Sequence, residues 1–147
     1  TEIYTLSLHD ALPISGRAPF PRGQVMYATN YDENDQKSIV DLIDLLAALK
    51  NKLYFVHICF GAMDRDDKVN MVKIKSFVEK KYPGQDIVFD IVESENILEG
   101  FDHYVETNHI DLIAVTTHKR SFLNKYFSPS FTRRLISHSR IPILVFQ

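Results

Sequence analysis

Residues 108–147, NHIDLIAVTTHKRSFLNKYFSPSFTRRLISHSRIPILVFQ, decide the fold of this chain. The apolar run Leu112 to Val115 predicts a buried strand, and a polar loop follows it. A helix is expected from about Ser130 to His138, before a final apolar strand from Ile143 to Phe146. Ligands of open α/β sheets bind where loops leave the carboxyl ends of strands, so this loop marks the candidate site.

Upstream of this stretch, strand and helix patterns alternate. Further strands are predicted at Gln24 to Thr29, Leu53 to Phe60 and Ile87 to Val92. Helices are predicted around the apolar face of residues 39–46, over Asp67 to Tyr82 and over residues 97–105. In the second of these helices, Val69 and Val72 are expected on the apolar face. The pattern predicts an α/β fold: a single open, five-stranded parallel sheet with right-handed crossovers and helices on both faces.

Composition indicates one ordinary domain. The chain has 147 residues, 45% of them hydrophobic and 24% charged, which suffices for a core and argues against disorder. The single cysteine, Cys59, excludes an intrachain disulfide and fits a reducing compartment, and no apolar run is long enough to span a bilayer. We therefore expect a cytoplasmic protein without a membrane partner.

Charge is unevenly distributed along the chain. From Leu112 onward there are six Lys or Arg and no acid, whereas the remaining 111 residues carry 11 basic and all 19 acidic groups. With a sequence pI of about 6.3, the chain lacks the basic excess of a nucleic-acid-binding module, so nucleic-acid binding is not favoured as the role of the cluster. A basic surface that meets an acidic partner domain or subunit is favoured, and a solvated helix face is the alternative.

The first residues require a separate interpretation. Thr1 to Ile14, TEIYTLSLHDALPI, is not a secretory signal and resembles the conceptual translation of a short-read sequencing adapter. We interpret residues 1–15 as an adapter-derived artefact joined to a gene fragment, with an irregular N-terminal arm as the alternative. Residues 16–23 have the composition of a linker, and residues 24–147 form the expected domain.

The segment DLIAVTTHKRSFLNKYFSPSFTRRLISHSRIPILVF resembles the C-terminal motif region of the universal stress protein family. The resemblance implies a doubly wound, Rossmann-like domain related to the adenine nucleotide alpha hydrolases, and many members bind ATP. Nucleotide-binding members carry Gly, two residues, Gly, nine residues and then Gly-Ser. In this chain the same spacing falls on Thr116, Lys119, Pro129 and Ser130, so only the serine matches.

The first predicted strand carries the other half of the resemblance. Family members usually end it with a pattern like ATDFSE, and this chain has ATNYDE at residues 28–33, with Asn30 in place of the acid. If a nucleotide site is retained, the resemblance places it at Thr29, Asn30, Thr116, Lys119 and Ser130. Side chains at the glycine positions would crowd a backbone phosphate cradle, and Pro129 has no N–H to donate. We therefore expect no bound cofactor and no ATP binding in the usual mode.

No catalytic constellation is indicated. His118 and Ser121 follow Asp111 in the chain, but the G-x-S-x-G elbow of a hydrolase is missing from the sequence. His57 lies within an apolar strand and is interpreted as a hydrogen-bonded core residue rather than a metal ligand, and Cys59 as a small buried hydrophobe. The protein is expected not to be an enzyme and to hold no metal.

Taken with the edge position expected for Ile141 to Phe146, the resemblance favours a non-catalytic stress-response module. It would act by pairing through that edge strand, with itself as a dimer or with an upstream homologous domain, as in the C-terminal domain of a tandem-domain member. The alternative is an ATP- or AMP-binding stress sensor with a remodelled phosphate loop, in which slow hydrolysis would be a minor activity.

Overall fold

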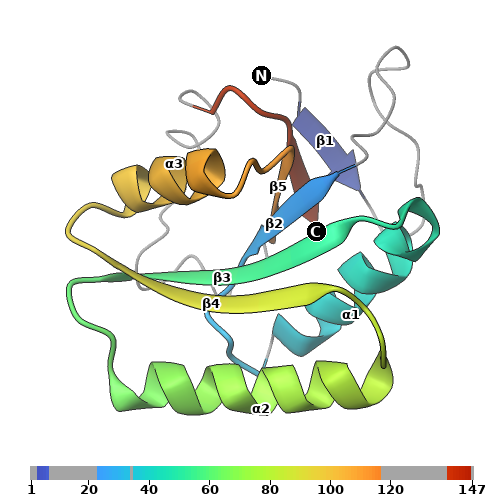
Figure 1. Cartoon of the computed structure of the whole chain (residues 1–147), viewed down its shortest axis with the longest axis horizontal. Helices are drawn as coiled ribbons and strands as arrows, with labels where there is room; N and C mark the ends of the chain where they lie inside the picture. Colours follow the sequence, from blue (N-terminus) through green and yellow to red (C-terminus); the bar gives the residue numbers. More distant parts are fainter. Residues whose placement is uncertain (1–2, 7–22, 34, 117–138, 147) are drawn as a thin grey trace.

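The computed structural model describes residues 3–6, 23–33, 35–116 and 139–146. Within these residues six parallel strands form one sheet, and helices cover both of its faces (Figure 1). The strands are β1 (Ile3–Leu6), β2 (Gln24–Ala28), β3 (Lys52–Phe60), β4 (Ile87–Ser94), β5 (Leu112–Thr116) and β6 (Ile143–Phe146). The helices are α1 (Asp35–Leu46), the 3₁₀ turn η1 (Ala47–Leu49), α2 (Arg65–Lys81) and α3 (Ile97–Thr107).

The sheet has the order β1-β6-β5-β2-β3-β4. The predicted five-stranded parallel sheet is confirmed as β2 to β6, with bounds close to those expected from the apolar runs. The chain moves from β2 outward through β3 and β4, and then returns to the other side of β2 for β5 and β6. The helix expected over residues 130–138 lies outside the described residues.

The position of the last strand differs from the expectation. We expected β6 at a sheet edge, but it lies between β5 and β1, which pairs with it in parallel from Ile3 opposite Ile143 to Leu6 opposite Phe146. An uncovered edge offers a row of backbone N–H and C=O groups to any extended segment. The sequence interpretation assigns residues 1–15 to an artefact and 16–23 to a linker, so it predicts no strand among them. This pairing shows which strand covers the edge of β6. It does not test the interpretation of residues 1–15 as an adapter-derived artefact, which stays a prediction.

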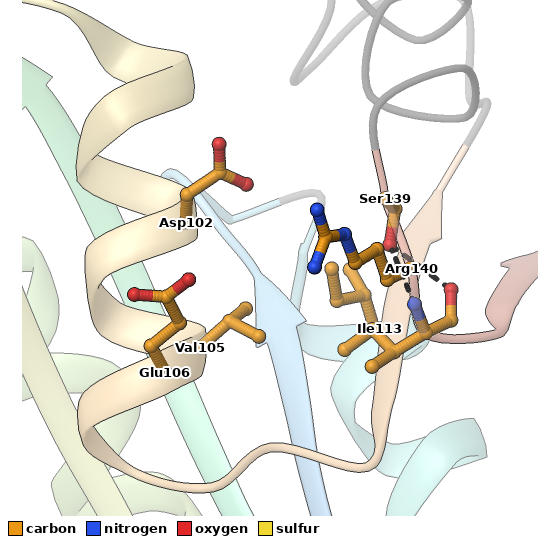
Figure 2. Close-up of a pocket in the computed structure, with 7 residues that line it drawn as sticks. Asp102, Val105, Glu106, Ile113, Ser139 and Arg140 are labelled. Carbon is orange, nitrogen blue, oxygen red and sulfur yellow. Dashed lines mark hydrogen bonds between the residues drawn. The ribbon is translucent and has the colours of Figure 1, made fainter.

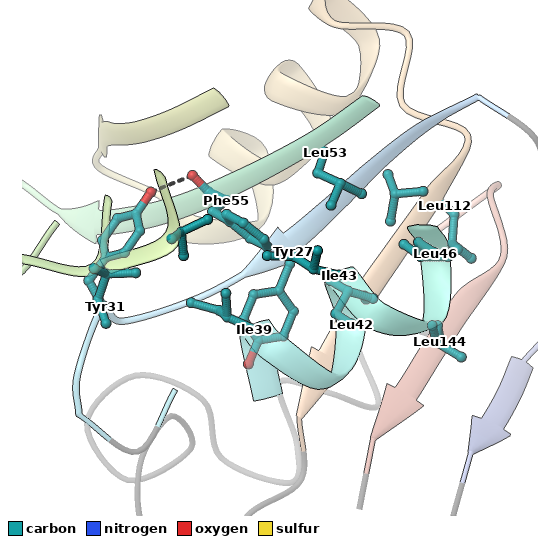
Figure 3. Close-up of a cluster of buried hydrophobic side chains, with 14 residues drawn as sticks. Tyr27, Tyr31, Ile39, Leu42, Ile43, Leu46, Leu53, Phe55, Leu112 and Leu144 are labelled. Carbon is teal, nitrogen blue, oxygen red and sulfur yellow. Dashed lines mark hydrogen bonds between the residues drawn. The ribbon is translucent and has the colours of Figure 1, made fainter. Parts of the chain in front are cut away.

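Two apolar layers hold the helices to the sheet. On one face α1 and α2 pack over alternate residues of the central strands, including Tyr27, Phe55 and Leu112 (Figure 3). On the other face α3 packs through Phe101 and Tyr104 over the intervening strand residues. The period of two along each strand therefore divides its side chains between two cores, as a sheet covered on both faces requires.

Helix α2 buries less than its sequence suggests. Ile74 and Val78 are buried, but Val69 and Val72, which were expected on the apolar face, are 42% and 56% exposed. The edge strand β4 is itself only half-buried, so α2 has little sheet to cover and keeps a narrow apolar stripe.

Helix α3 approaches the sheet closely at Gly100. A Cβ at this position would lie 2.9 Å from the Ser94 Cβ and 3.0 Å from the Ile58 Cγ2. The side chain of Asn96 caps the helix by accepting from the amides of Leu98 and Glu99. A cap at its start and a glycine at its contact with β3 and β4 thus fix where α3 sits.

Candidate functional site

The carboxyl ends of β2 and β5 lie side by side, and they mark the point where the strand order reverses. The register pairs Tyr27 with Ala114, so continuing it places Thr29 level with Thr116. The fold therefore brings together Thr29, Asn30 and Thr116 from the predicted set. This is the switch point at which open α/β sheets bind ligands. Lys119 and Ser130 lie outside the described residues.

Thr29 is fully buried, and its hydroxyl is used within the protein. It donates to Asp35 Oδ2 at 2.7 Å and accepts from the Tyr31 amide at 2.8 Å. The backbone amide of Thr29 donates to the Val56 carbonyl at 3.0 Å, which ties the residue to β3. A ligand at this edge would meet the neighbouring turn rather than the Thr29 hydroxyl.

Asp35 organises that turn, although no sequence pattern singles it out. It is the first residue of α1 and its side chain is fully buried. Besides the Thr29 hydroxyl, its carboxylate accepts from the Asn30 amide at 2.9 Å and from the Tyr27 hydroxyl at 3.2 Å. A carboxylate at a helix N-terminus is favoured by the helix dipole, which offsets part of the cost of burial.

Burial controls the protonation of the acids and phenols near Asp35. Desolvation raises the pKa of Asp35, and the charge of Asp32 adds to this effect, while the hydrogen bond from Thr29 acts in the opposite direction. Desolvation likewise raises the pKa of Tyr27 and of Tyr31, so both phenols remain neutral donors at physiological pH.

Tyr31 anchors the turn from the opposite side. Its backbone has φ +55°, an uncommon conformation for a residue with a side chain. The buried phenol donates to the carbonyl of Phe55 and lies 3.0 Å from the Asp90 carbonyl and 3.1 Å from the Asp90 amide. The turn is therefore fixed both to β3, the neighbour of β2, and to the edge strand β4.

His57 lies beneath the same turn. It is 5% exposed, and its Nδ1 lies 3.0 Å from the Thr29 carbonyl, so its interpretation as a hydrogen-bonded core residue is confirmed. Cys59, two residues later in β3, is buried as expected, and its Sγ lies 3.4 Å from the Val92 carbonyl. Desolvation raises the pKa of the Cys59 thiol, which disfavours the reactive thiolate.

Of the residues suggested for a hydrolase, the structure describes Asp111. Asp111 immediately precedes β5 and binds the Gln24 amide at 2.8 Å, at the amino end of the sheet. His118 and Ser121 follow the carboxyl end of β5 and lie outside the described residues.

A cavity of about 420 Å³ lies on the α3 face, away from the switch point. Figure 2 shows Asp102, Val105 and Glu106 of α3 on one side and Ile113 and Arg140 on the other. Ile113 is the second residue of β5, so the cavity is nearer the amino end of the strands. Sequence patterns did not indicate this cavity, because Arg140 and the α3 residues lie more than 30 residues apart in the chain.

Among the described residues, no group of three or more His, Cys, Asp or Glu is arranged to hold a metal ion. None of the helices in the described part of the chain is long and apolar enough to cross a membrane.

Comparison with known proteins is consistent with this architecture. The profile of the universal stress protein family matches residues 22–147. No curated protein sequence matches the chain significantly.

Three solved structures illustrate the similarity of fold. A universal stress protein family member from Burkholderia pseudomallei is 14% identical, with a TM-score of 0.63 over 84% of this chain and 95% of that one. A universal stress protein in complex with cAMP is 14% identical, with a TM-score of 0.64 over 85% and 96% of the two chains. The Archaeoglobus fulgidus protein in complex with dAMP is 10% identical, with a TM-score of 0.60 over 85% and 97%.

Proposed function

The chain belongs to the universal stress protein family, and we propose that its domain is a non-catalytic regulatory module of the stress response. In this proposal it acts by pairing with another protein surface, and it does not grip ATP in the family's usual way. The arrangement of the turn after β2 is the observation that carries the proposal.

Polar groups of that turn are directed toward Asp35. The carboxylate binds both the Thr29 hydroxyl and the Asn30 amide, and Asn30 itself replaces the acid found in nucleotide-binding relatives. In the sequence, Thr116 and Lys119 fall at glycine positions of the family motif. Side chains at these positions would fill the space through which backbone amides approach a phosphate.

The proposed interaction surface is the outer edge of β6. Its four residues form a parallel ladder with β1, which supports the proposal that this edge accepts an added strand. A second copy or a homologous domain would compete with β1 for this edge, because one row of backbone groups pairs with only one strand. Pairing in trans is therefore proposed for a chain that lacks the first residues.

Sedimentation would test the pairing. Residues 22–147, which the family profile matches, are expected to self-associate more strongly than the full chain at the same concentration. The Pro142 carbonyl accepts from the Ile113 amide of β5, so by alternation Val145 directs its amide to the outer edge, and Val145→Pro would serve as a negative control in both lengths. Equal association of the two lengths would contradict a role for the β6 edge.

A second candidate function is an adenine-nucleotide sensor. Similar solved structures hold cAMP and dAMP, and this fold brings Thr29, Asn30 and Thr116 to one switch point. In such a sensor Lys119 would contact phosphate by its side chain, with Ser130 as a hydrogen-bonding partner.

Calorimetry on the full chain with ATP and with AMP separates the two candidates. The regulatory module predicts no saturable heat with either nucleotide. A micromolar dissociation constant that is lost in Lys119→Glu and weakened in Ser130→Ala would support the sensor instead. Lys125→Glu makes the same charge change in the same basic segment and is the matched control.

A further inference from the structure

The imidazole of His57 joins two segments that are far apart in the sequence. The side chain projects from β3 and is 5% exposed. Its Nδ1 lies 3.0 Å from the carbonyl oxygen of Thr29, just after β2. Its Nε2 lies 3.6 Å from Oδ1 of Asp67, in the first turn of α2. Both ring nitrogens therefore face oxygen atoms that can only accept hydrogen bonds.

The two facing oxygens distinguish the neutral imidazole from the imidazolium. A neutral imidazole carries one N–H, and the short contact with the Thr29 carbonyl places it on Nδ1. The lone pair of Nε2 then faces the Asp67 carboxylate, which is an unfavourable contact. The imidazolium has N–H groups on both nitrogens and satisfies both oxygens at once.

We propose that His57 is a proton-operated tie between the turn after β2 and the N-terminus of α2. On protonation, Nε2 donates to Asp67 and draws the first turn of α2 toward the sheet. On loss of that proton only the Thr29 contact remains, and the start of α2 is released. Acidification is thus an input that this module reads without any nucleotide.

The groups around the ring favour such a response. The second oxygen of Asp67 accepts from the Asp64 amide at 3.1 Å, and Asp64 accepts from the Asp67 amide at 2.8 Å. Any movement of the Asp67 carboxylate therefore acts on the cap of α2. Asp35 of α1 accepts a hydrogen bond from the Thr29 hydroxyl. In the turn after β2, the neutral ring of Tyr31 lies edge-on to His57 with centroids 6.5 Å apart. From β4, Glu93 accepts from the Met63 amide at 2.9 Å, in the loop that leads to α2.

Histidine is the side chain whose charge ordinarily changes between pH 5 and 8. The decisive measurement is the ¹⁵N spectrum of the His57 ring in the full chain across this range. A proton on Nδ1 throughout, joined by a second proton on Nε2 toward the acidic end, is expected. A neutral ring with its proton on Nε2, or a protonation state that does not change across the range, would overturn the proposal.

Variants then link the ring to the helix. In the wild-type chain, amide exchange protection in the first turn of α2, corrected for intrinsic rates, should be about tenfold higher at the acidic end. This is the effect expected from the gain of one charge-assisted hydrogen bond. Asp67→Asn keeps an oxygen for the Asp64 amide and offers an N–H to neutral Nε2, so it should abolish this pH dependence.

Asp66→Asn removes a charge from the same helix turn and should leave the response unchanged. His57→Asn keeps a donor for Thr29 but cannot titrate, and it should also give a flat profile. Persistence of the pH dependence in Asp67→Asn would refute the tie.

Discussion

The two ends of β2 are fixed by the same device in opposite surroundings. At the amino end, Asp111 accepts from the Gln24 amide at 2.8 Å, and its own amide donates back to the Gln24 carbonyl at 2.8 Å. At the carboxyl end, Asp35 accepts from the Asn30 amide at 2.9 Å. Asp111 is exposed, whereas Asp35 is fully buried.

Burial changes what each carboxylate does. Asp111 joins β2 to β5 at a surface where water can replace a lost hydrogen bond. Asp35 also satisfies two buried hydroxyls, of Thr29 and Tyr27, whose side chains are shielded from solvent. A hydrogen bond is worth far more when its loss leaves a buried group without a partner, so the carboxyl end should be the more sensitive of the two.

Asp35→Ala is expected to have the largest effect. It removes the acceptor of three buried or half-buried donors, and we expect a loss of about 3 kcal/mol in the free energy of unfolding. Denaturant titration would measure the loss. Asp41→Ala in the same helix, which breaks only the exposed pair with Lys37, should cost less than about 0.5 kcal/mol. Equal costs would remove the contrast between buried and exposed acids.

Gly23→Ala tests the amino end by steric means. A Cβ at this position would lie 2.0 Å from Asp111 Oδ2, while the Gly23 carbonyl is held by the amide of Lys52 at 3.2 Å. The exposed Asp111 side chain must swing away and lose the Gln24 amide, at a cost of about 1.5 kcal/mol. In an Asp111→Ala background the clash disappears, so the two substitutions should cost less together than the sum of their separate effects.

Asp111→Asn should have a smaller effect. The amide oxygen can still accept from the Gln24 amide, and only the charge is lost, so a change within about 0.5 kcal/mol is expected. A cost as large as that of Asp35→Ala would show that the exposed anchor is as important as the buried one.

The smallest expected effect is a pH dependence of stability that comes from the buried Asp35. The pKa of Asp35 is raised on folding, chiefly by burial. Its contribution to stability is therefore fully present below the ordinary range of an aspartic acid and is lost as the pH rises through the raised value. Wild-type protein should lose stability relative to Asp35→Asn as the pH rises from acid toward neutral, in urea titrations at a series of pH values. The same comparison with Asp111→Asn supplies the control.

Sequence periodicity predicted the parts of the fold that depend on local pattern. The apolar runs of β3 and β5 and the amphipathic face of α1 appear where expected, because burial on one or two faces imposes its own period. The exposed valines of α2 were not predictable, since their environment depends on α2 covering an edge strand.

The candidate site was only partly predictable. The resemblance placed Thr29, Asn30 and Thr116 at one edge, and the structure brings these three together. Asp35 was missed because a single Asp at a helix start usually signals a cap, and nothing in its neighbours distinguishes a buried acid from an exposed one. The contact between His57 and Asp67 depends on how α2 lies on the sheet.

The sequence by itself determined a parallel α/β domain of the universal stress protein family, because hydrophobic period and motif spacing are properties of the chain. Only the tertiary structure decided which polar groups meet: the donors around Asp35, the acceptors around His57, and β1 at the outer edge of β6. These contacts join residues from different strands and helices. Their energies depend on distance and burial, which exist only once the elements have packed.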